Sequence, residues 1–86
     1  MLKIVFTRKA DKFLQKLIKK NPKASKLITD KIDKLVINPN SLTSKRLVNT
    51  PYYRARAENY RIIYRYDKVN LFIVEINKRE VVYRNI

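Results

Sequence analysis

The chain has 86 residues, of which 45% are hydrophobic and 33% are charged, so it has room for one compact domain with a single modest core. It carries 21 Lys and Arg against 7 Asp and Glu, a formal net charge of +14, and such a chain attracts polyanions. It contains neither cysteine nor histidine, which excludes disulfides and thiolate metal sites and leaves Arg, Lys, Tyr and carboxylates for any catalysis. We expect one domain over residues 1–86, with no cofactor and no bound metal.

No apolar run approaches the length of about 20 residues that a membrane-spanning helix needs. The apolar start at residues 1–6 is too short, and too soon followed by charge, for a signal peptide. We therefore expect a cytoplasmic protein without a membrane partner.

The first half of the chain predicts a strand and two helices. Residues 2–6 form a short β-branched run that ends at Thr7, a residue suited to cap a helix. Apolar residues then recur with the helical period from about Lys9 to Lys19, and lysines fill the other positions. A second such run begins at Asn21-Pro22, a helix-start signal, and ends at Asn38-Pro39. Two antiparallel helices follow, and their narrow apolar stripes need a further hydrophobic surface.

The second half of the chain predicts the sheet that supplies this surface. Residues 38–50 are polar without a clear period, which is typical of a loop. Residue alternation and apolar content predict strands at residues 52–57, 60–66 and 71–76, and a last short strand at residues 81–83. The order βααβββ predicts an α+β fold, with a helical hairpin on one face of a mainly antiparallel four-stranded sheet and the other face open.

Two short junctions, at residues 58–59 and 67–68, predict hairpin turns between these strands. The chain has no glycine, so another residue must take any position with a positive φ. Asparagine tolerates that conformation best, and we expect Asn59 to adopt it.

Arginine is concentrated in the second half of the chain. Residues 1–43 contain ten Lys and one Arg, whereas residues 44–86 contain seven Arg and three Lys. Alternation places Arg54 and Arg56 on one face of their strand, and Arg61 and Arg65 on one face of the next. Like charges opposed across a hairpin are unfavourable unless an anion lies between them. The pattern favours an anion site on the open face over ordinary solvated arginines, with Tyr60 and Tyr64 in the core.

Three segments together resemble the RelE/ParE superfamily of toxins: YRAR at residues 53–56, NYRIIY at 59–64 and NKREVVYR at 77–84. The resemblance covers nearly the whole chain. Members of the RelE branch bind the ribosomal A site, cut the messenger RNA there, and are held inactive by an antitoxin encoded beside them. The resemblance therefore implies the toxin of a type II toxin-antitoxin pair, a ribosome-dependent endoribonuclease or mRNA interferase. Its implied partners are an acidic antitoxin, in a hetero-oligomer, and the ribosome with its mRNA.

The resemblance also implies site residues. Arg54 and Arg56 fall where the RelE branch has basic residues, and Arg61 falls on its phosphate-binding arginine. Arg79 matches the arginine after the last long strand, and Tyr83 matches the terminal tyrosine. This chain departs from the family pattern in two respects. Lys78 stands where many relatives have histidine, and Arg54 and Arg56 stand where some relatives have lysines.

The implied reaction is attack of a ribose 2′-OH on its own 3′ phosphate, which needs a base, stabilisation of a dianion and an acid. Arginine stabilises the dianion well, but it does not deprotonate in proteins. The candidates for the general base are Lys78, Glu58, Glu80 and Tyr83. Alternatively, the site has no side-chain base and relies on alignment of the RNA by the ribosome.

Two other functions remain open. The ParE branch of the superfamily poisons DNA gyrase and is not a nuclease. A nucleic-acid-binding regulator without catalysis is a further alternative, because tyrosines on a basic open sheet can stack bases as well as border phosphates.

Overall fold

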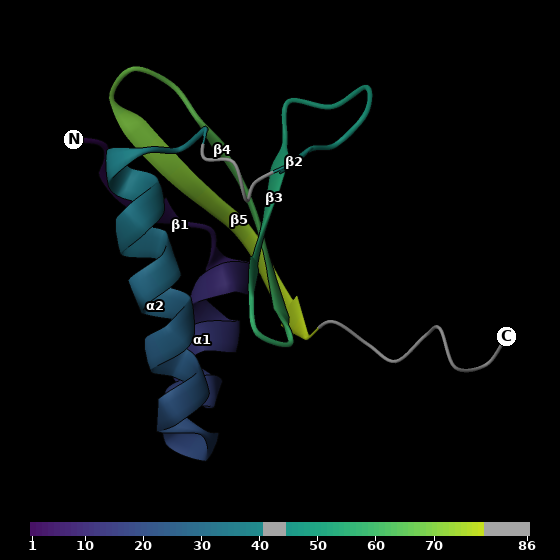
Figure 1. Ribbon diagram of the computed structural model, residues 1–86. Helices are drawn as coiled ribbons and strands as arrows, with labels where there is room; N and C mark the ends of the chain where they lie inside the picture. Colours follow the sequence, from purple (N-terminus) through teal and green to yellow (C-terminus); the bar gives the residue numbers. More distant parts are fainter. Residues whose placement is uncertain (41–44, 79–86) are drawn as a thin grey trace, which may run out of the picture.

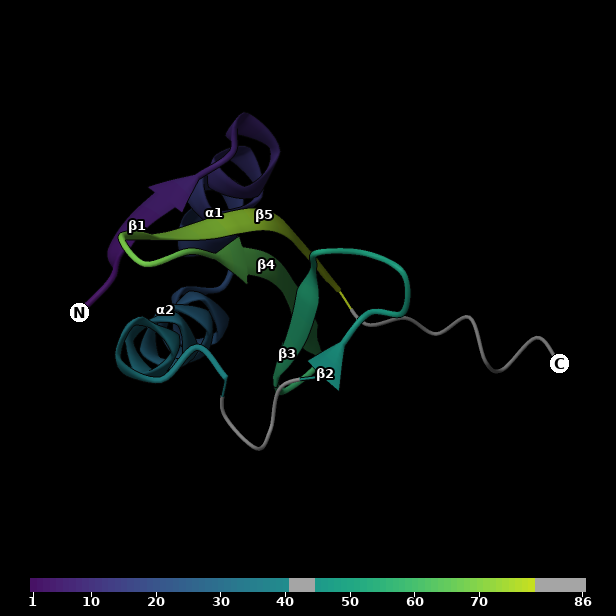
Figure 2. The ribbon, with the colours of Figure 1, turned by 90° about the horizontal axis from the view of Figure 1, so that it is seen from above.

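The computed structural model describes residues 1–40 and 45–78 (Figure 1). The elements in chain order are β1 (Lys3–Phe6), α1 (Arg8–Lys20), α2 (Pro22–Ile37), β2 (Lys45–Arg46), β3 (Tyr53–Ala57), β4 (Tyr60–Tyr66) and β5 (Asn70–Lys78). Figures 1 and 2 show the two helices side by side against the sheet, with α1 next to β1 and β5 and α2 lying toward β3. The expected α+β fold, a helical hairpin on a mainly antiparallel sheet, is confirmed.

The sheet has five strands in the order β1-β5-β4-β3-β2, rather than the four we expected. The first strand runs parallel to β5, and the other neighbours are antiparallel. The additional strand, β2, lies inside the predicted loop and pairs only Lys45 with Arg54 and Arg46 with Tyr53. Two residues are too few to produce a period in the sequence. The strand predicted at residues 81–83 lies outside the described residues.

Both helices begin at the residues that the sequence indicated. The Thr7 hydroxyl accepts a hydrogen bond from the Ala10 N–H at 3.2 Å, and the Asn21 amide oxygen accepts one from the Ala24 N–H at 3.2 Å. Each bond satisfies one of the free N–H groups of a first helical turn. Pro22 follows Asn21 at the start of α2, where its missing N–H costs nothing. Within the described residues, neither helix is long and apolar enough to cross a membrane.

The core lies between the helices and one face of the sheet. Its largest fully buried side chains are Tyr64, Ile28, Ile32, Leu35, Ile62, Leu71 and Ile73. The expectation that Tyr60 and Tyr64 fill the core is confirmed. The Tyr64 hydroxyl donates a hydrogen bond to the Pro39 carbonyl, which ties the end of α2 to the middle of the sheet.

The turn between β3 and β4 corrects one expectation. Glu58, and not Asn59, has the positive φ, at 57°. Ala57 and Tyr60 pair across a two-residue turn, and in a type II′ turn only the first central residue takes a positive φ. The position in the turn outweighs the preference of asparagine for this conformation.

Candidate nucleic-acid interface

The face of the sheet opposite the helices carries the arginines. Buried residues alternate along β3 and β4, and they are Ala55, Ala57, Tyr60, Ile62 and Tyr64. The residues between them point away from the core. Arg54, Arg56 and Arg61 therefore lie on the open face, as the sequence predicted.

The strand register arranges this face in rows. Arg56 on β3 is directly opposite Arg61 on β4, and Arg61 is opposite Asn77 on β5. In the next row Lys45 is opposite Arg54, Arg54 is opposite Ile63, and Ile63 is opposite Glu75. We call these two rows, together with the Arg65–Phe72 pair of the same face, the arginine face.

Arg65 belongs to the same face but has a partner. It is directly opposite Phe72, and its guanidinium carbon lies 4.1 Å from the centroid of the Phe72 ring. This is a cation–π contact. Arg65 is therefore held against the sheet, one row beyond Arg54.

The other three arginines have no carboxylate partner in the described part of the chain. There the ion pairs join Lys9 to Glu75 and Lys26 to Asp30, each at 3.5 Å. Arg56 and Arg61 face each other across the hairpin although both are cationic, which is unfavourable without an anion. Guanidinium groups bind phosphate oxygens in a bidentate manner, so the arrangement suits a phosphate.

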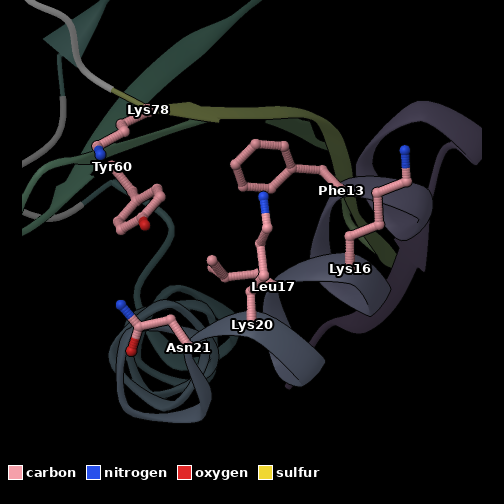
Figure 3. Close-up of a pocket in the computed structure, with 7 residues that line it drawn as sticks. All are labelled: Phe13, Lys16, Leu17, Lys20, Asn21, Tyr60 and Lys78. Carbon is pink, nitrogen blue, oxygen red and sulfur yellow. The ribbon is translucent and has the colours of Figure 1, made fainter.

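Lys78 does not join this group. It is directly opposite Tyr60, whose ring is buried on the helix side, so the Lys78 side chain belongs to the other face of the sheet. There it lines a cavity of about 580 Å³ whose walls include Phe13, Leu17 and Tyr60 (Figure 3). Lys16 and Lys20 also line it. The structure thus separates Lys78 from the arginines, while Arg79 and Tyr83 lie outside the described residues.

The positive surface continues around the edge of β3. Arg56 lines a hollow of about 300 Å³ together with Lys31 and Lys34 of α2, and with Asp30 and Glu58. Burial, and secondly the nearby charge of Lys34, lower the pKa of Lys31. Anions that bind Arg56 therefore have further ammonium groups within the same hollow.

Three tyrosines form a stack on the helix side of the sheet. The rings of Tyr53 and Tyr64 are 5.5 Å apart, and those of Tyr53 and Tyr66 are 5.2 Å apart. A hydrogen bond with Tyr53, followed by burial, raises the pKa of Tyr66. Because these rings share the core side with Tyr64, they do not extend the arginine face.

Sequence reasoning missed three polar members of the arginine face. Lys45 lies on β2, which the sequence did not predict. Glu75 lies on the strand predicted at residues 71–76, and Asn77 follows directly after it. This strand is apolar on both faces, so alternation could not show which face of the sheet each residue occupies. A bulge in the pairing of β4 with β5, between Ile63 and Tyr64, further shifts the register.

The fold and the face define a small α+β protein with a cationic surface on an open sheet. The sequence profile of the family described as "ParE toxin of type II toxin-antitoxin system, parDE" matches residues 4–83. The chain therefore belongs to the ParE toxin family, and it is a type II toxin of the RelE/ParE superfamily. No curated protein sequence matches it.

Solved structures show the same fold. The YoeB/ParE toxin from Agrobacterium tumefaciens matches with a TM-score of 0.80 and 17% identity, over 92% of this chain and 100% of that one. A YoeB-YefM complex from Staphylococcus aureus matches with a TM-score of 0.77 and 22% identity, over 94% and 99%. The toxin-antitoxin complex RelBE2 from Mycobacterium tuberculosis matches with a TM-score of 0.73 and 24% identity, over 91% and 98%.

Proposed function

We propose that the chain is a ribosome-dependent endoribonuclease that cuts messenger RNA in the ribosomal A site. The observation that carries this proposal is the direct register of Arg56 with Arg61, on a face where neither has a carboxylate partner within the described residues. Cross-strand neighbours lie about 5 Å apart at Cβ, so two guanidinium groups can grip one phosphate. Such a pair stabilises the dianion that forms when a ribose 2′-OH attacks its 3′ phosphate.

The rest of the arginine face favours an extended polyanion, rather than a small anion, as its ligand. Lys45 and Arg54 stand in the row beside the pair, and the hollow at Arg56 adds Lys31 and Lys34. A net charge of +14 attracts RNA over a longer range. The ribosome then supplies the alignment that a small, shallow site lacks.

A gyrase poison is the second candidate, and the description of the matching family as ParE toxin favours it. A poison of this kind binds a protein and has no need for a cationic pair poised at one phosphate. The arginine face therefore favours the nuclease.

Mapping 5′ ends of messenger RNA by primer extension, after brief expression of the protein, tests the proposal. We expect new 5′ ends inside reading frames of translated messages, and their loss when translation is blocked before induction. Broken DNA together with intact transcripts would show a gyrase poison instead. Strong growth arrest with neither lesion would indicate a binding protein without nuclease activity.

We also propose that an acidic antitoxin covers part of the arginine face. Solved structures with this fold include the YoeB-YefM, RelBE2 and DinJ-YafQ complexes. For this chain the argument is its charge, since a protein at +14 binds any nucleic acid unless a partner masks it. Hydrogen exchange should slow along β3 and β4 in the complex. A basic partner, or equal exchange in the free and bound toxin, would contradict masking.

A further inference from the structure

The arginine face contains one carboxylate within the described residues, that of Glu75. It stands opposite Ile63 and diagonal to Arg61, because Arg61 pairs with Asn77, the next residue on the same side of β5. Diagonal neighbours on one face of a sheet are about 7 Å apart, within the reach of long side chains. The ribose of a phosphate bound to Arg61 can therefore come within reach of Glu75.

The two oxygens of the Glu75 carboxylate have different surroundings. Oε2 accepts a hydrogen bond from the Asn77 side-chain amide at 2.9 Å and lies 3.5 Å from the Lys9 ammonium. Oε1 has no partner in residues 1–40 and 45–78. The side chain is 34% exposed, so Oε1 can be reached from the open face. One oxygen is thus fixed and the other is free to accept a hydrogen bond.

The two groups that fix Oε2 come from different elements. Asn77 is two residues further along β5, and Lys9 is in the first turn of α1. On the side of β5 away from β4, no described strand pairs with Glu75, because β1 ends at Phe6, in register with Ile73. The Lys9 side chain can therefore reach Glu75 around the sheet edge. The position of the carboxylate is set by the fold rather than by a mobile loop.

From this geometry we infer that Glu75 is the general base of the reaction, an inference that rests on the proposed function. Oε1 takes the proton of the 2′-OH while O2′ forms a bond to phosphorus and the bond from phosphorus to O5′ breaks. O5′ takes a proton from water, and the proton on Glu75 then neutralises the hydroxide that is left. The products are a 2′,3′-cyclic phosphate and a 5′-hydroxyl end, and Arg56 and Arg61 balance the charge of the intermediate.

The other described candidates for a base are less well placed. Lys78 lies on the opposite face of the sheet, in the cavity with Phe13 and Tyr60. Glu58 lies in the β3–β4 turn and lines hollows on the α2 side. Asp67 accepts the N–H groups of its own turn. Glu75 alone among these is in a row with the arginines.

Single-turnover cleavage of messenger RNA on programmed ribosomes tests the inference with Glu75→Gln, which keeps the shape of the side chain and one acceptor oxygen but cannot take the proton. We expect a loss of about 10²-fold or more in the cleavage rate, with ribosome binding unchanged. Glu75→Asp should retain part of the rate.

Asp33→Asn is the matched control, because it removes one exposed carboxylate of α2 that lies off the arginine face, and it should cleave like the wild type. Cleavage by Glu75→Gln at the wild-type rate would overturn the role of Glu75 while leaving the nuclease intact. A large loss confined to Lys78→Ala would do the same and would return the base to Lys78. Absence of cleavage by the wild-type protein would overturn both the nuclease and its base.

Discussion

Arg56 and Arg61 are direct cross-strand partners on the open face of the sheet, whereas their neighbours along the two strands, Ala55, Ala57, Tyr60 and Ile62, are buried in the core. Only one residue pair, Ala57 with Tyr60, separates them from the turn of the hairpin. A short hairpin fixes its register firmly, because the turn and the alternation of buried side chains agree. The two cations are consequently held together by the fold, and an anion relieves their repulsion.

Arg61→Ala should abolish toxicity and cleavage while leaving the protein folded. The substitution removes a charge from the open face and leaves the buried side chains in place. Growth after induction at matched expression, together with a thermal melt, measures both effects. Arg8→Ala, at the exposed start of α1, removes the same charge elsewhere and should remain toxic. Full toxicity of Arg61→Ala would remove this residue from the site.

Arg54→Ala should weaken RNA binding and reduce its dependence on salt. Each phosphate contact to a single strand contributes about 0.7 to the slope of log K against log salt concentration. We expect the slope to fall by roughly that amount. Fluorescence anisotropy with a short labelled RNA, at several salt concentrations, measures it. Lys12→Ala, on the exposed side of α1, is the control, and an equal fall in both variants would mean that binding is diffuse.

Ile28→Ala should destabilise the protein by about 2 to 5 kcal/mol, as buried large-to-small substitutions do. Ile28 is fully buried, whereas its neighbour Leu27 is 41% exposed. Leu27→Ala should therefore cost much less. Urea unfolding followed by circular dichroism compares the two. Equal losses would show that α2 does not pack on the sheet through Ile28.

Asp67 should titrate below the ordinary range of an aspartate. Backbone N–H groups of Asn70 and Val69 donate to its Oδ1 at 2.7 and 2.8 Å and lower the pKa of Asp67. A carboxylate whose pKa is lower in the folded than in the unfolded chain stabilises the fold at pH values above its unfolded-state pKa. This contribution is lost as the pH falls through its folded-state pKa. Carboxyl NMR measures the midpoint, and a midpoint equal to that of Asp in a short peptide would contradict these bonds.

The elements of the fold could largely be predicted from the sequence, because the hydrophobic period, the helix caps and the turn residues indicate the same helices and strands. The caps at Thr7 and Asn21 and the strand at residues 60–66 illustrate this agreement. Half of the site could be predicted as well, since alternation puts Arg54 and Arg56 on one face of their strand and puts Arg61 on the face of the next strand that points away from the core.

The remaining half depends on strand pairing. Alternation within one strand does not say which residue of β5 lies beside Arg61, and the bulge near Ile63 makes the register harder to infer. For this reason Lys78 was expected in the site and lies on the other face, one residue away from Asn77, while Glu75 was missed. A single step along a strand reverses the side to which a residue points.

The pairing of β1 with β5 also governs when the toxin can assemble during synthesis. Residues 3–6 pair with residues 70–73, so the first strand made waits for the last described one before it has a neighbour in the sheet. Contacts this distant in sequence form late and slowly. The hairpin with Arg56 and Arg61 is translated earlier, but Glu75 and Asn77 join it only with β5. The sheet of a nascent chain is therefore incomplete until nearly all of the domain has been translated.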